Sequence, residues 1–395
     1  MHSDSLETMM KTTSIGLRLA SAAIALSAAL GAAHAADIKL GAAEALSGGA
    51  AQYGVAIKNG FLLALDEINA AGGVGGNKLV LVLEDEQGKK EEVANVFKKL
   101  FFQDNVLMTF GPTLSNSAQS GDPIAQAAKV VVFGTSNTAD GITSIGDYVF
   151  RNSVTEADVL PETLKMAVKK SGVKKVAVLY GNDDVFTKNG YDNFKKALED
   201  QKIPVTTTET YAKGDVDFKA QLTKIKATNP DALVLSALLA EGAPIMVQAR
   251  QLGLNVPVIG GNGMNSTKVF DLAKGSSDGL YVGSPWSASN ATPENSKFIK
   301  AYTDKYKDAP DQFAAQAYDA MYIVAEALKK TKLTGTLATD RAALRDALPA
   351  VKHVGATGPF AFRQVMGKDG KPAGYDAQQV PIVSVTKDGK FSIEK

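Results

Sequence analysis

Apolar strand patterns alternate with amphipathic helix patterns along almost the whole chain, and this alternation limits the fold more than any other feature. Residues 38–42 have an apolar strand pattern, and the next segment places Ile57, Phe61, Leu65 and Ile68 on one helical face. The alternation continues with a strand at 78–84, a helix at 90–103, a strand at 106–110, a helix at 115–128 and a strand at 129–134. This order predicts a doubly wound lobe around a parallel sheet.

A second series of the same construction begins near Arg151. It has helices at 158–170, 188–201, 217–227 and 243–252, and strands at 174–180, 204–210, 231–236 and 256–260. Two long helices follow at 294–307 and 312–330, and short strands end the chain near 380–385 and 390–393. We therefore expect an α/β fold of two doubly wound, Rossmann-like lobes. Because no low-complexity linker separates the two series, we expect tight crossings between the lobes.

Composition argues against several classes of function. The 395 residues carry a formal net charge of +1, which gives no reason to expect a nucleic-acid partner. The chain has no cysteine, so disulfides, thiolate metal sites and thiol nucleophiles are impossible. After residue 35, His353 is the only histidine, so we expect no metal, no cofactor and no Ser/His catalysis.

Three segments approach catalytic or nucleotide-binding motifs without completing them. Residues 134–138 lack the final glycine of a nucleophile elbow, and residues 72–76 lack the Gly-Lys-Ser/Thr ending of a phosphate loop. In the segment that starts at Gly261, Ser266 stands where the third glycine of a dinucleotide fingerprint belongs. We therefore expect a protein that is not an enzyme.

The N-terminal segment is typical of an export signal. Basic residues precede an apolar run at 19–30, which is followed by the small-residue pattern Ala-His-Ala at 33–35. We expect residues 1–35 to be a signal peptide that is cleaved near Ala35, which places the mature protein in the periplasm. Met9 or Met10 would make a more ordinary start. An uncleaved membrane anchor is the alternative, although the apolar run is short for a bilayer span.

Hydroxyl and amide side chains follow two strands of the first series. Ser115 comes after the strand at 106–110 and begins a helix, and Thr135, Ser136 and Asn137 come directly after the next strand. The carboxyl ends of parallel strands meet at one edge of a sheet, where ligands commonly bind. Hydroxyls, amides and the free N–H groups of a helix start can together bind a carboxylate. In the alternative interpretation, Ser115 and Ser136 only cap helices.

Four segments also carry a family resemblance. They are ALSGGAAQYG at 45–54, DEINAAGG at 66–73, GPTLSNS at 111–117 and AAQAYDA at 314–320. Together and in this order, they resemble the leucine/isoleucine/valine-binding protein family, the substrate-binding components of ABC importers for hydrophobic amino acids. The resemblance covers essentially the whole chain after the N-terminal segment.

The resemblance implies the fold of a type I periplasmic binding protein, in which the chain crosses between the lobes three times. We expect these crossings near residues 151–153, 284–286 and 359–363. Lobe 1 would then comprise residues 36–151 and 286–360, and lobe 2 residues 152–285 and 361–395. Bending about such crossings would close the cleft over a ligand.

The resemblance also implies which residues line the cleft. Ser115 and residues 135–137 lie where family members hold the α-carboxylate of the ligand. Tyr53 matches a position whose ring covers the ligand, and Phe186 aligns approximately with an aromatic position on the opposite lobe. Two further candidates are Tyr318, in the helix segment at 314–320, and Trp286, the only tryptophan. For these aromatic residues, ordinary core packing is the alternative.

The chain departs from the family pattern in the second lobe. Members specific for α-amino acids commonly have a glutamate that pairs with the ligand ammonium where this chain has Asn262, and a family tyrosine is replaced by Leu238 or Leu239. Burial of an ammonium without a carboxylate partner is costly. We therefore predict a small carboxylate ligand with an apolar or aromatic body and no α-amino group. Glu241 or Asp184 would restore amino-acid binding if either reaches the cleft.

Transport-coupled binding is the function that this sequence predicts. The protein would act as a monomer that binds its ligand and delivers it to an inner-membrane ABC permease. Branched-chain or other hydrophobic amino acids are the alternative ligands in the same role. A ligand-sensing receptor domain is the alternative function, although such a receptor would need a membrane or signalling segment after the lobes and this chain stops at Lys395.

Overall fold

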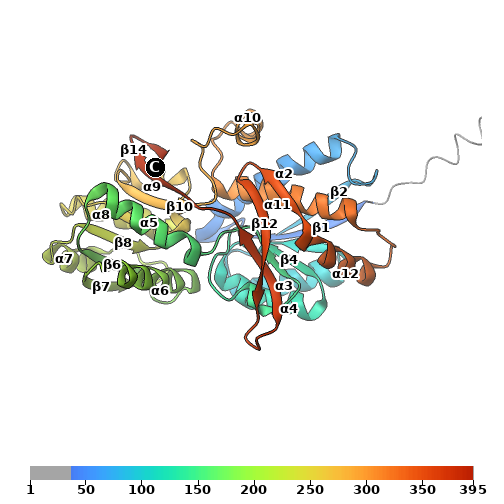
Figure 1. The fold of residues 1–395 in the computed structure, drawn as a ribbon, viewed down its shortest axis with the longest axis horizontal. Helices are drawn as coiled ribbons and strands as arrows, with labels where there is room; N and C mark the ends of the chain where they lie inside the picture. Colours follow the sequence, from blue (N-terminus) through green and yellow to red (C-terminus); the bar gives the residue numbers. More distant parts are fainter. Residues whose placement is uncertain (1–36, 395) are drawn as a thin grey trace, which may run out of the picture.

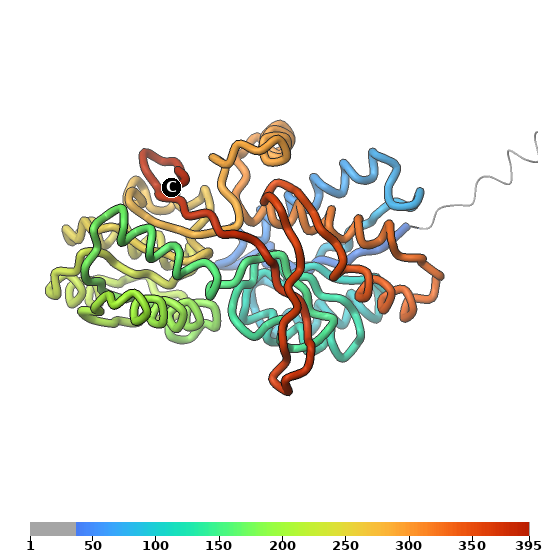
Figure 2. Tube along the Cα trace, in the orientation of Figure 1, coloured from blue at the N-terminus to red at the C-terminus, as the bar shows by residue number. Residues whose placement is uncertain are grey.

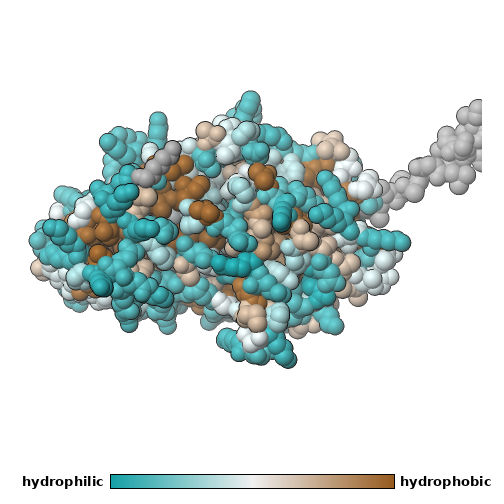
Figure 3. All heavy atoms as spheres, in the orientation of Figure 1, coloured by the Kyte–Doolittle hydropathy of each residue, from teal (hydrophilic) through white to brown (hydrophobic). Residues whose placement is uncertain are grey.

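The computed structural model describes residues 37–394, which form two α/β lobes that lie side by side (Figure 1). An eight-stranded sheet is the centre of one lobe, and a seven-stranded sheet is the centre of the other. The prediction of two doubly wound α/β lobes is therefore confirmed. In residues 37–394, no helix is both long and apolar enough to span a membrane. The face in Figure 3 is mainly hydrophilic, with its apolar residues in separate patches.

The sheet of the first lobe has the strand order β11-β12-β13-β5-β4-β3-β1-β2. Its strands are β1 Ile38–Glu44, β2 Leu79–Asp85, β3 Met108–Phe110, β4 Val131–Gly134, β5 Val149–Arg151, β11 Lys352–Gly355, β12 Gly358–Met366 and β13 Pro372–Gln378. The helices of this lobe are η1 Gly48–Ala50, α2 Ala51–Ala70, α3 Lys90–Phe102, α4 Ser115–Ala128, η2 Thr143–Ile145, α10 Pro293–Tyr306, α11 Gln312–Lys330, α12 Leu337–Ala347 and η4 Leu348–Ala350. Strands β1 to β5 are parallel, as the alternating pattern predicts.

The sheet of the second lobe has the strand order β15-β14-β10-β9-β8-β6-β7. Its strands are β6 Val176–Gly181, β7 Val205–Tyr211, β8 Ala232–Ser236, β9 Val258–Gly260, β10 Leu280–Ser284, β14 Ile382–Lys387 and β15 Lys390–Ile393. The helices of this lobe are α5 Glu156–Ser171, α6 Val185–Asp200, α7 Lys219–Ala227, α8 Leu239–Gln251, η3 Asn262–Met264 and α9 Lys268–Ala273. Strands β6 to β10 are parallel, whereas β14 and β15 are antiparallel additions at one edge.

Burial explains why the sequence folds into these layers. Strand β8 is buried at all five positions, as expected for a parallel strand covered by helices on both faces. Helix α11 packs closely against α2 because Gly60 has no side chain. A Cβ atom at Gly60 would lie 2.2 Å from the carbonyl oxygen of Ala314. The helix pair covers the first sheet near the cleft and fixes the position of the first turn of α11.

Two helices of the second lobe begin three or four residues earlier than their patterns predict. Helix α6 begins at Val185 and α8 begins at Leu239, whereas the patterns predict starts at residues 188 and 243. Asp184 explains the earlier start of α6, because its Oδ1 accepts a hydrogen bond from the backbone N–H of Thr187 at 3.1 Å and caps the helix. These two added turns reach the interlobe cleft.

The chain crosses between the lobes three times. Residues 152–155 connect β5 to α5, and residues 285–292 connect β10 to α10, both close to the expected positions. The third crossing was expected near residues 359–363, and this expectation is wrong. Residues 379–381 make the crossing, between β13 in the first sheet and β14 in the second. Figure 2 shows it as the dark red tube that runs from one lobe to the other.

The hairpin of β12 and β13 moves the third crossing toward the C-terminus. Strand β13 lies next to β5, where Tyr375 pairs with Phe150. A buried ion pair of 2.7 Å between Arg151 Nε and Asp376 Oδ1 stabilises this junction. Residues 361–378 therefore lie in the first sheet and not in the second lobe. We propose that lobe 1 comprises residues 37–151 and 286–378, and lobe 2 residues 152–285 and 379–394.

Candidate functional site

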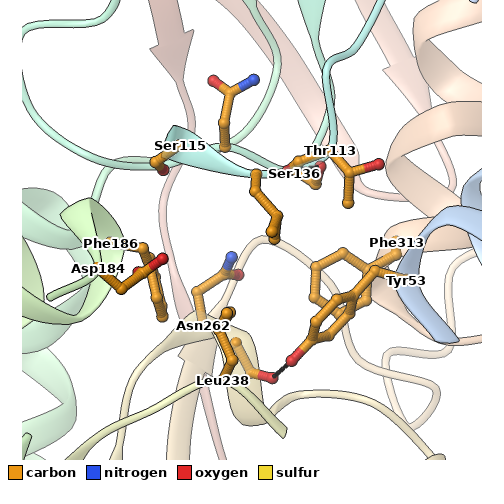
Figure 4. Close-up of a pocket in the computed structure, with 12 residues that line it drawn as sticks. Tyr53, Thr113, Ser115, Ser136, Asp184, Phe186, Leu238, Asn262 and Phe313 are labelled. Atoms are coloured by element: carbon orange, nitrogen blue, oxygen red, sulfur yellow. Dashed lines mark hydrogen bonds between the residues drawn. The ribbon is translucent and has the colours of Figure 1, made fainter. Parts of the chain in front are cut away.

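A cavity lies between the lobes, at the carboxyl ends of the parallel strands (Figure 4). Small-molecule sites in proteins commonly have this position. We call the residues that line it from the first lobe the lobe 1 wall: Tyr53, Thr113, Leu114, Ser115, Ser136, Asn137 and Phe313. The lobe 2 wall consists of Asp184, Phe186, Leu238, Asn262 and Gly263. A ligand in this cavity would contact both lobes.

Ser115 presents a free hydroxyl proton to the cavity. Its Oγ accepts hydrogen bonds from the backbone N–H groups of Thr138 and Ala139, at 3.3 Å each. Both bonds use lone pairs of the oxygen, so the one proton of the hydroxyl remains available to a ligand. Ser115 also begins α4, and the first N–H groups of a helix have no partner within it. The hydroxyl and the helix dipole together favour a carboxylate at this corner.

Ser136 and Asn137 use their side-chain donors within the first lobe. Ser136 Oγ donates to the backbone carbonyl of Thr113 at 2.7 Å, and Asn137 Nδ2 donates to the backbone carbonyl of Pro112 at 2.9 Å. These bonds join the loop after β4 to the loop after β3. The two side chains therefore make the lobe 1 wall rigid, and the Ser115 hydroxyl and the second N–H of Asn137 remain as side-chain donors for a ligand carboxylate.

Tyr53 and Phe313 form an aromatic side of the cavity. Their ring centroids lie 4.7 Å apart, and Figure 4 shows the two rings side by side. The Tyr53 hydroxyl donates to the backbone carbonyl of Gly263 at 2.8 Å and accepts from the backbone N–H of Leu239 at 2.7 Å. Both partners belong to the second lobe, so Tyr53 holds the lobes together across the cleft.

Asp184 places a carboxyl group in the lobe 2 wall. In addition to its helix cap, its Oδ2 accepts a hydrogen bond from Nδ2 of Asn116, in the first lobe, at 2.6 Å. Burial raises the pKa of Asp184 above its usual value. Figure 4 shows its carboxyl group beside Phe186. Glu241, the other carboxylate considered from the sequence, accepts a bond from the backbone N–H of Gly214 and does not line the cavity.

The rest of the lobe 2 wall consists of apolar residues around the side-chain amide of Asn262. Phe186 comes from the first turn of α6, and Leu238 directly precedes α8. Asn262 begins η3, and its backbone N–H donates to Glu156 Oε1 at 3.2 Å. Burial raises the pKa of Glu156 to about 7. Figure 4 shows the side-chain amide of Asn262 projecting into the cavity.

Two carboxyl groups are buried behind the lobe 1 wall. Glu44 Oε2 accepts a hydrogen bond of 2.5 Å from the hydroxyl of Thr113, and Glu86 Oε2 accepts one of 2.8 Å from the hydroxyl of Ser117. Burial raises the pKa of Glu44 to about 8 and the pKa of Glu86 to about 7. The negative charge behind the Ser115 corner therefore increases as the pH rises through the neutral range.

The structure brings six of the nine candidate site residues into one cavity. They are Tyr53, Ser115, Ser136, Asn137, Phe186 and Asn262, and their contact with a ligand stays a prediction. Thr135 is buried but does not line the cavity. Tyr318 lies elsewhere, because its hydroxyl donates to Glu67 at 2.8 Å and its ring packs 4.9 Å from that of Phe298. Trp286 is buried at the second crossing and also does not line the cavity.

Four lining residues were not predicted as ligand contacts: Thr113, Leu114, Gly263 and Phe313. Thr113 and Leu114 belong to the 111–117 segment of the family resemblance, which contained the signal for them. Phe313 directly precedes the 314–320 segment. Asp184 and Leu238 were considered from the sequence as an alternative charge and as a departure from the pattern. The structure places both in the lobe 2 wall.

Comparison with known proteins gives consistent matches over this chain. Residues 37–390 match the family model described as periplasmic binding protein. The leucine-, isoleucine-, valine-, threonine-, and alanine-binding protein of Pseudomonas aeruginosa is 29% identical over 294 residues, which cover 74% of this chain and 78% of that protein. The Leu/Ile/Val-binding protein of Escherichia coli K12 is 26% identical over 289 residues, which cover 72% of this chain and 77% of that protein.

Solved structures agree with the sequence matches. LivJ of Streptococcus pneumoniae, a branched-chain amino acid transporter substrate binding protein in complex with isoleucine, is 30% identical with a TM-score of 0.82. The similarity covers 91% of this chain and 99% of that chain. An ABC transporter solute binding protein of R. palustris in complex with benzoate has a TM-score of 0.79 at 23% identity, over 90% of this chain and 95% of that chain. At this lower identity, the match supports the fold alone.

Proposed function

Since this chain belongs to the periplasmic binding protein family, we propose that its interlobe cavity binds a small carboxylate with an apolar or aromatic body and no α-amino group. The chain is a non-enzymatic solute-binding protein of an ABC transporter, of the Leu/Ile/Val-binding type, with the type I periplasmic binding protein fold. This fold holds isoleucine in one relative and benzoate in another, so the fold alone leaves the ligand class open. The residues of the two walls decide it.

The side chain of Asn262 carries the proposal. An α-ammonium in the cavity needs a negatively charged partner, and Asn262 offers an uncharged amide instead. The Ser115 corner still offers a free hydroxyl proton and a helix start to a carboxylate. Tyr53, Phe186 and Phe313 supply a surface for an apolar or aromatic body.

Hydrophobic amino acids are the second candidate ligands, and Asp184 is the observation that favours them. Its carboxyl group lines the cavity and could pair with a ligand ammonium. Against this, both of its oxygens already accept hydrogen bonds, from Asn116 Nδ2 and from the backbone N–H of Thr187. These bonds fix the carboxyl group to the first turn of α6 and to the opposite lobe.

We propose the wider role from the family. The protein binds its ligand as a monomer in the periplasm, closes around it, and delivers it to an inner-membrane ABC permease. Removal of residues 1–35 as a signal peptide is part of this proposal, and these residues lie outside the part of the chain that the structure describes. The closed cleft, joined by Tyr53, supports ligand capture by two lobes.

A thermal-shift screen of the protein purified from cells tests the ligand class. The screen compares leucine with 4-methylpentanoate, and phenylalanine with 3-phenylpropanoate, so that each pair differs only in the amino group. A ligand that binds only the folded state raises the melting temperature, and we expect the larger rise with the deaminated acid of each pair. The primary amides of the two acids are controls and should give no rise. Larger rises with leucine or phenylalanine would favour the second candidate.

A further inference from the structure

We propose that Gln312, which does not line the cavity, determines that Asn262 presents a hydrogen-bond donor to the ligand, and that the preferred ligands are therefore oxo acids or similar acids with an acceptor oxygen beside Asn262. This inference rests on the proposed function and narrows its ligand class. Gln312 acts through Asn262 and is a positioning residue.

Three side-chain amides form a row that leads from the backbone to the cavity. Asn265 Nδ2 donates to the carbonyl oxygen of Trp286 at 3.4 Å and to Gln312 Oε1 at 2.7 Å. Gln312 Nε2 donates in turn to Asn262 Oδ1. Asn265, Gln312 and Asn262 are all buried, and we call them the amide row.

The carbonyl of Trp286 fixes the direction of the amide row. A backbone carbonyl can only accept, so Asn265 must turn its NH₂ group toward it. The same NH₂ group faces Gln312, which must therefore present its oxygen to Asn265 and its NH₂ group to Asn262. Asn262 then uses its oxygen inside the row, and its own NH₂ group is left for the cavity. Reversal of the row would place the oxygen of Asn265 against the carbonyl oxygen of Trp286.

Hydrogen bonds hold the Trp286 carbonyl, at the backbone end of the amide row, in place. The Trp286 carbonyl also accepts a hydrogen bond of 2.5 Å from Ser284 Oγ, and the indole Nε1 of Trp286 donates to Asn295 Oδ1 at 2.6 Å. Asn295 Nδ2 donates to the backbone carbonyl of Ser287 at 3.0 Å. These bonds anchor the second crossing, so the carbonyl that orients the row keeps its position.

The amide row connects the two lobes. Asn262 and Asn265 belong to the second lobe, whereas Gln312 is the first residue of α11 in the first lobe. Asp311 fixes this helix start, because its Oδ1 accepts from the backbone N–H of Phe313 at 3.0 Å. The row is therefore complete only when the cleft is closed, and it selects among ligands in the closed form.

A ligand is selected by what it offers to the NH₂ group of Asn262. An acceptor oxygen completes the row, whereas an ammonium would leave two donors face to face in a buried site. A buried donor without a partner is costly, and we expect a discrimination of about 10- to 100-fold. An acid with only CH₂ at this place leaves the donor unpaired without adding a second one, so it should bind with intermediate affinity.

Isothermal titration with three acids of one carbon skeleton tests the inference. 4-Methyl-2-oxopentanoate, 4-methylpentanoate and leucine differ only in the group next to the carboxylate, and phenylpyruvate, 3-phenylpropanoate and phenylalanine form a second set. In the unmodified protein, at least one set should bind with the oxo acid tightest and the amino acid weakest. The expected ratio between oxo acid and amino acid is about 10- to 100-fold.

Gln312→Glu should abolish the preference for the oxo acid over the amino acid. A carboxylate at residue 312 can only accept, so Asn265 keeps its bond while Asn262 turns its NH₂ group inward and its oxygen toward the cavity. The ratio of oxo acid to amino acid affinity should fall by about 10- to 100-fold. Gln312→Met removes the row without adding charge, and the preference for the oxo acid over the plain acid should fall to about threefold or less.

Gln316→Glu is the matched control for charge. Gln316 is buried one turn further along α11 and bonds to the backbone of Asn152, outside the row. The role of Gln312 would be overturned if the affinity ratios in both Gln312 variants stayed within threefold of those in the unmodified protein. It would also be overturned if Gln316→Glu shifted the ratio of oxo acid to amino acid affinity as far as Gln312→Glu does. Tighter binding of leucine or phenylalanine than of both matching acids by the unmodified protein would instead overturn the proposed function. No binding of any of the six compounds would overturn both.

Discussion

The two walls of the interlobe cavity differ in how their polar groups are held. In the lobe 1 wall, Ser115, Ser136 and Asn137 are bonded to the backbone of their own lobe, and the hydroxyl proton of Ser115 and the second amide proton of Asn137 remain free. In the lobe 2 wall, Asp184 and Asn262 bond to side chains of the opposite lobe. Apart from the Tyr53 hydroxyl, which bonds to the second lobe, the polar groups of the lobe 1 wall are therefore held in place before closure, whereas those of the lobe 2 wall are completed by it.

This difference separates two tasks. The Ser115 hydroxyl and the start of α4 are in place before closure, so they can bind the carboxylate of any of these acids. Side chains that are oriented by closure can discriminate among the bodies and substituents of those acids. Substitutions in the lobe 1 wall should therefore weaken all carboxylates alike, and substitutions in the lobe 2 wall should change their relative affinities.

Asn262→Glu should have the largest effect on ligand affinity. A negative charge in the cavity beside a ligand carboxylate should weaken binding of 4-methylpentanoate by more than about 100-fold, and leucine should become the better ligand. Isothermal titration of both compounds measures the reversal. Gln251→Glu, which adds the same charge on the exposed side of α8, should leave both affinities unchanged. Equal losses for the two compounds in Asn262→Glu would contradict the assignment of selectivity to the lobe 2 wall.

Ser115→Ala should weaken every carboxylate ligand by a similar factor. Loss of a charge-assisted hydrogen bond to a buried carboxylate corresponds to roughly a 10- to 100-fold rise in the dissociation constant. The ratio between 4-methylpentanoate and 3-phenylpropanoate should stay the same. Ser120→Ala, on the same helix and outside the cavity, is the control. A change in the ratio larger than the common loss would contradict the comparison of the two walls.

The sequence predicts the lobe 1 wall well because its signal is local. Ser115 and Ser136 directly follow apolar strands, and parallel strands bring such positions to one edge of the sheet. Of the two aromatic residues predicted for this wall, Tyr53 lines the cavity and Tyr318 does not, whereas Phe313 does. Five positions along a helix turn a side chain by roughly 140°, so Tyr318 faces away from Phe313 and reaches Glu67 instead.

The second lobe and the third crossing depend on contacts that local patterns do not contain. The first turns of α6 and α8 reach the cavity because Asp184 caps one helix and Leu239 bonds to Tyr53 of the other lobe. Strand β13 joins the first sheet through the buried pair of Arg151 and Asp376, which lie 225 positions apart. Residues 367–374, which include the start of β13, are rich in glycine and charged residues and contain a proline, so the strand signal there is weak.

A change of pH should alter ligand affinity through the lobe 1 wall, by a smaller factor than the two substitutions above. Glu44 and Glu86, behind the lobe 1 wall, have pKa values that burial raises to about 8 and about 7. Below these values the groups are neutral, and above them they place negative charge behind the Ser115 corner. The affinity for 4-methylpentanoate should therefore fall by about tenfold or less as the pH rises from about 6 to 9.

Glu44→Gln makes this prediction specific. Titrations at each pH should give a flatter profile in the variant, whereas Glu199→Gln, on the surface of α6, should keep the profile of the unmodified protein. Stability should follow the same sign. The folded state holds the Glu44 proton between the ordinary pKa of about 4.5 and the raised value of about 8, so the free energy of unfolding falls as the pH rises through this window. A pH-independent affinity in the unmodified protein would argue against a carboxylate at this corner.

Asp184→Asn should change the affinity for the proposed ligands least, and it gives the most direct test of the amino-acid alternative. Asparagine has a single acceptor oxygen, which can retain the cap of α6, but its NH₂ group then faces Nδ2 of Asn116 and that bond across the cleft is lost. The two bonds of the Tyr53 hydroxyl still join the lobes. Removal of one negative charge from the cavity should leave 4-methylpentanoate affinity unchanged or raise it by about threefold.

The amino-acid alternative requires the opposite outcome from the same variant. If Asp184 paired with a ligand ammonium, its neutralisation would leave that charge buried without a partner, and leucine affinity would fall by about 100-fold or more. Isothermal titration of leucine and 4-methylpentanoate measures both arms, and Asp183→Asn, at the exposed neighbouring position, is the control. A carboxylate affinity that drops more than tenfold in Asp184→Asn but not in Asp183→Asn would mean that the bond between Asp184 and Asn116 holds the cleft closed. Selectivity would then depend on closure itself and not on the charge of the lobe 2 wall.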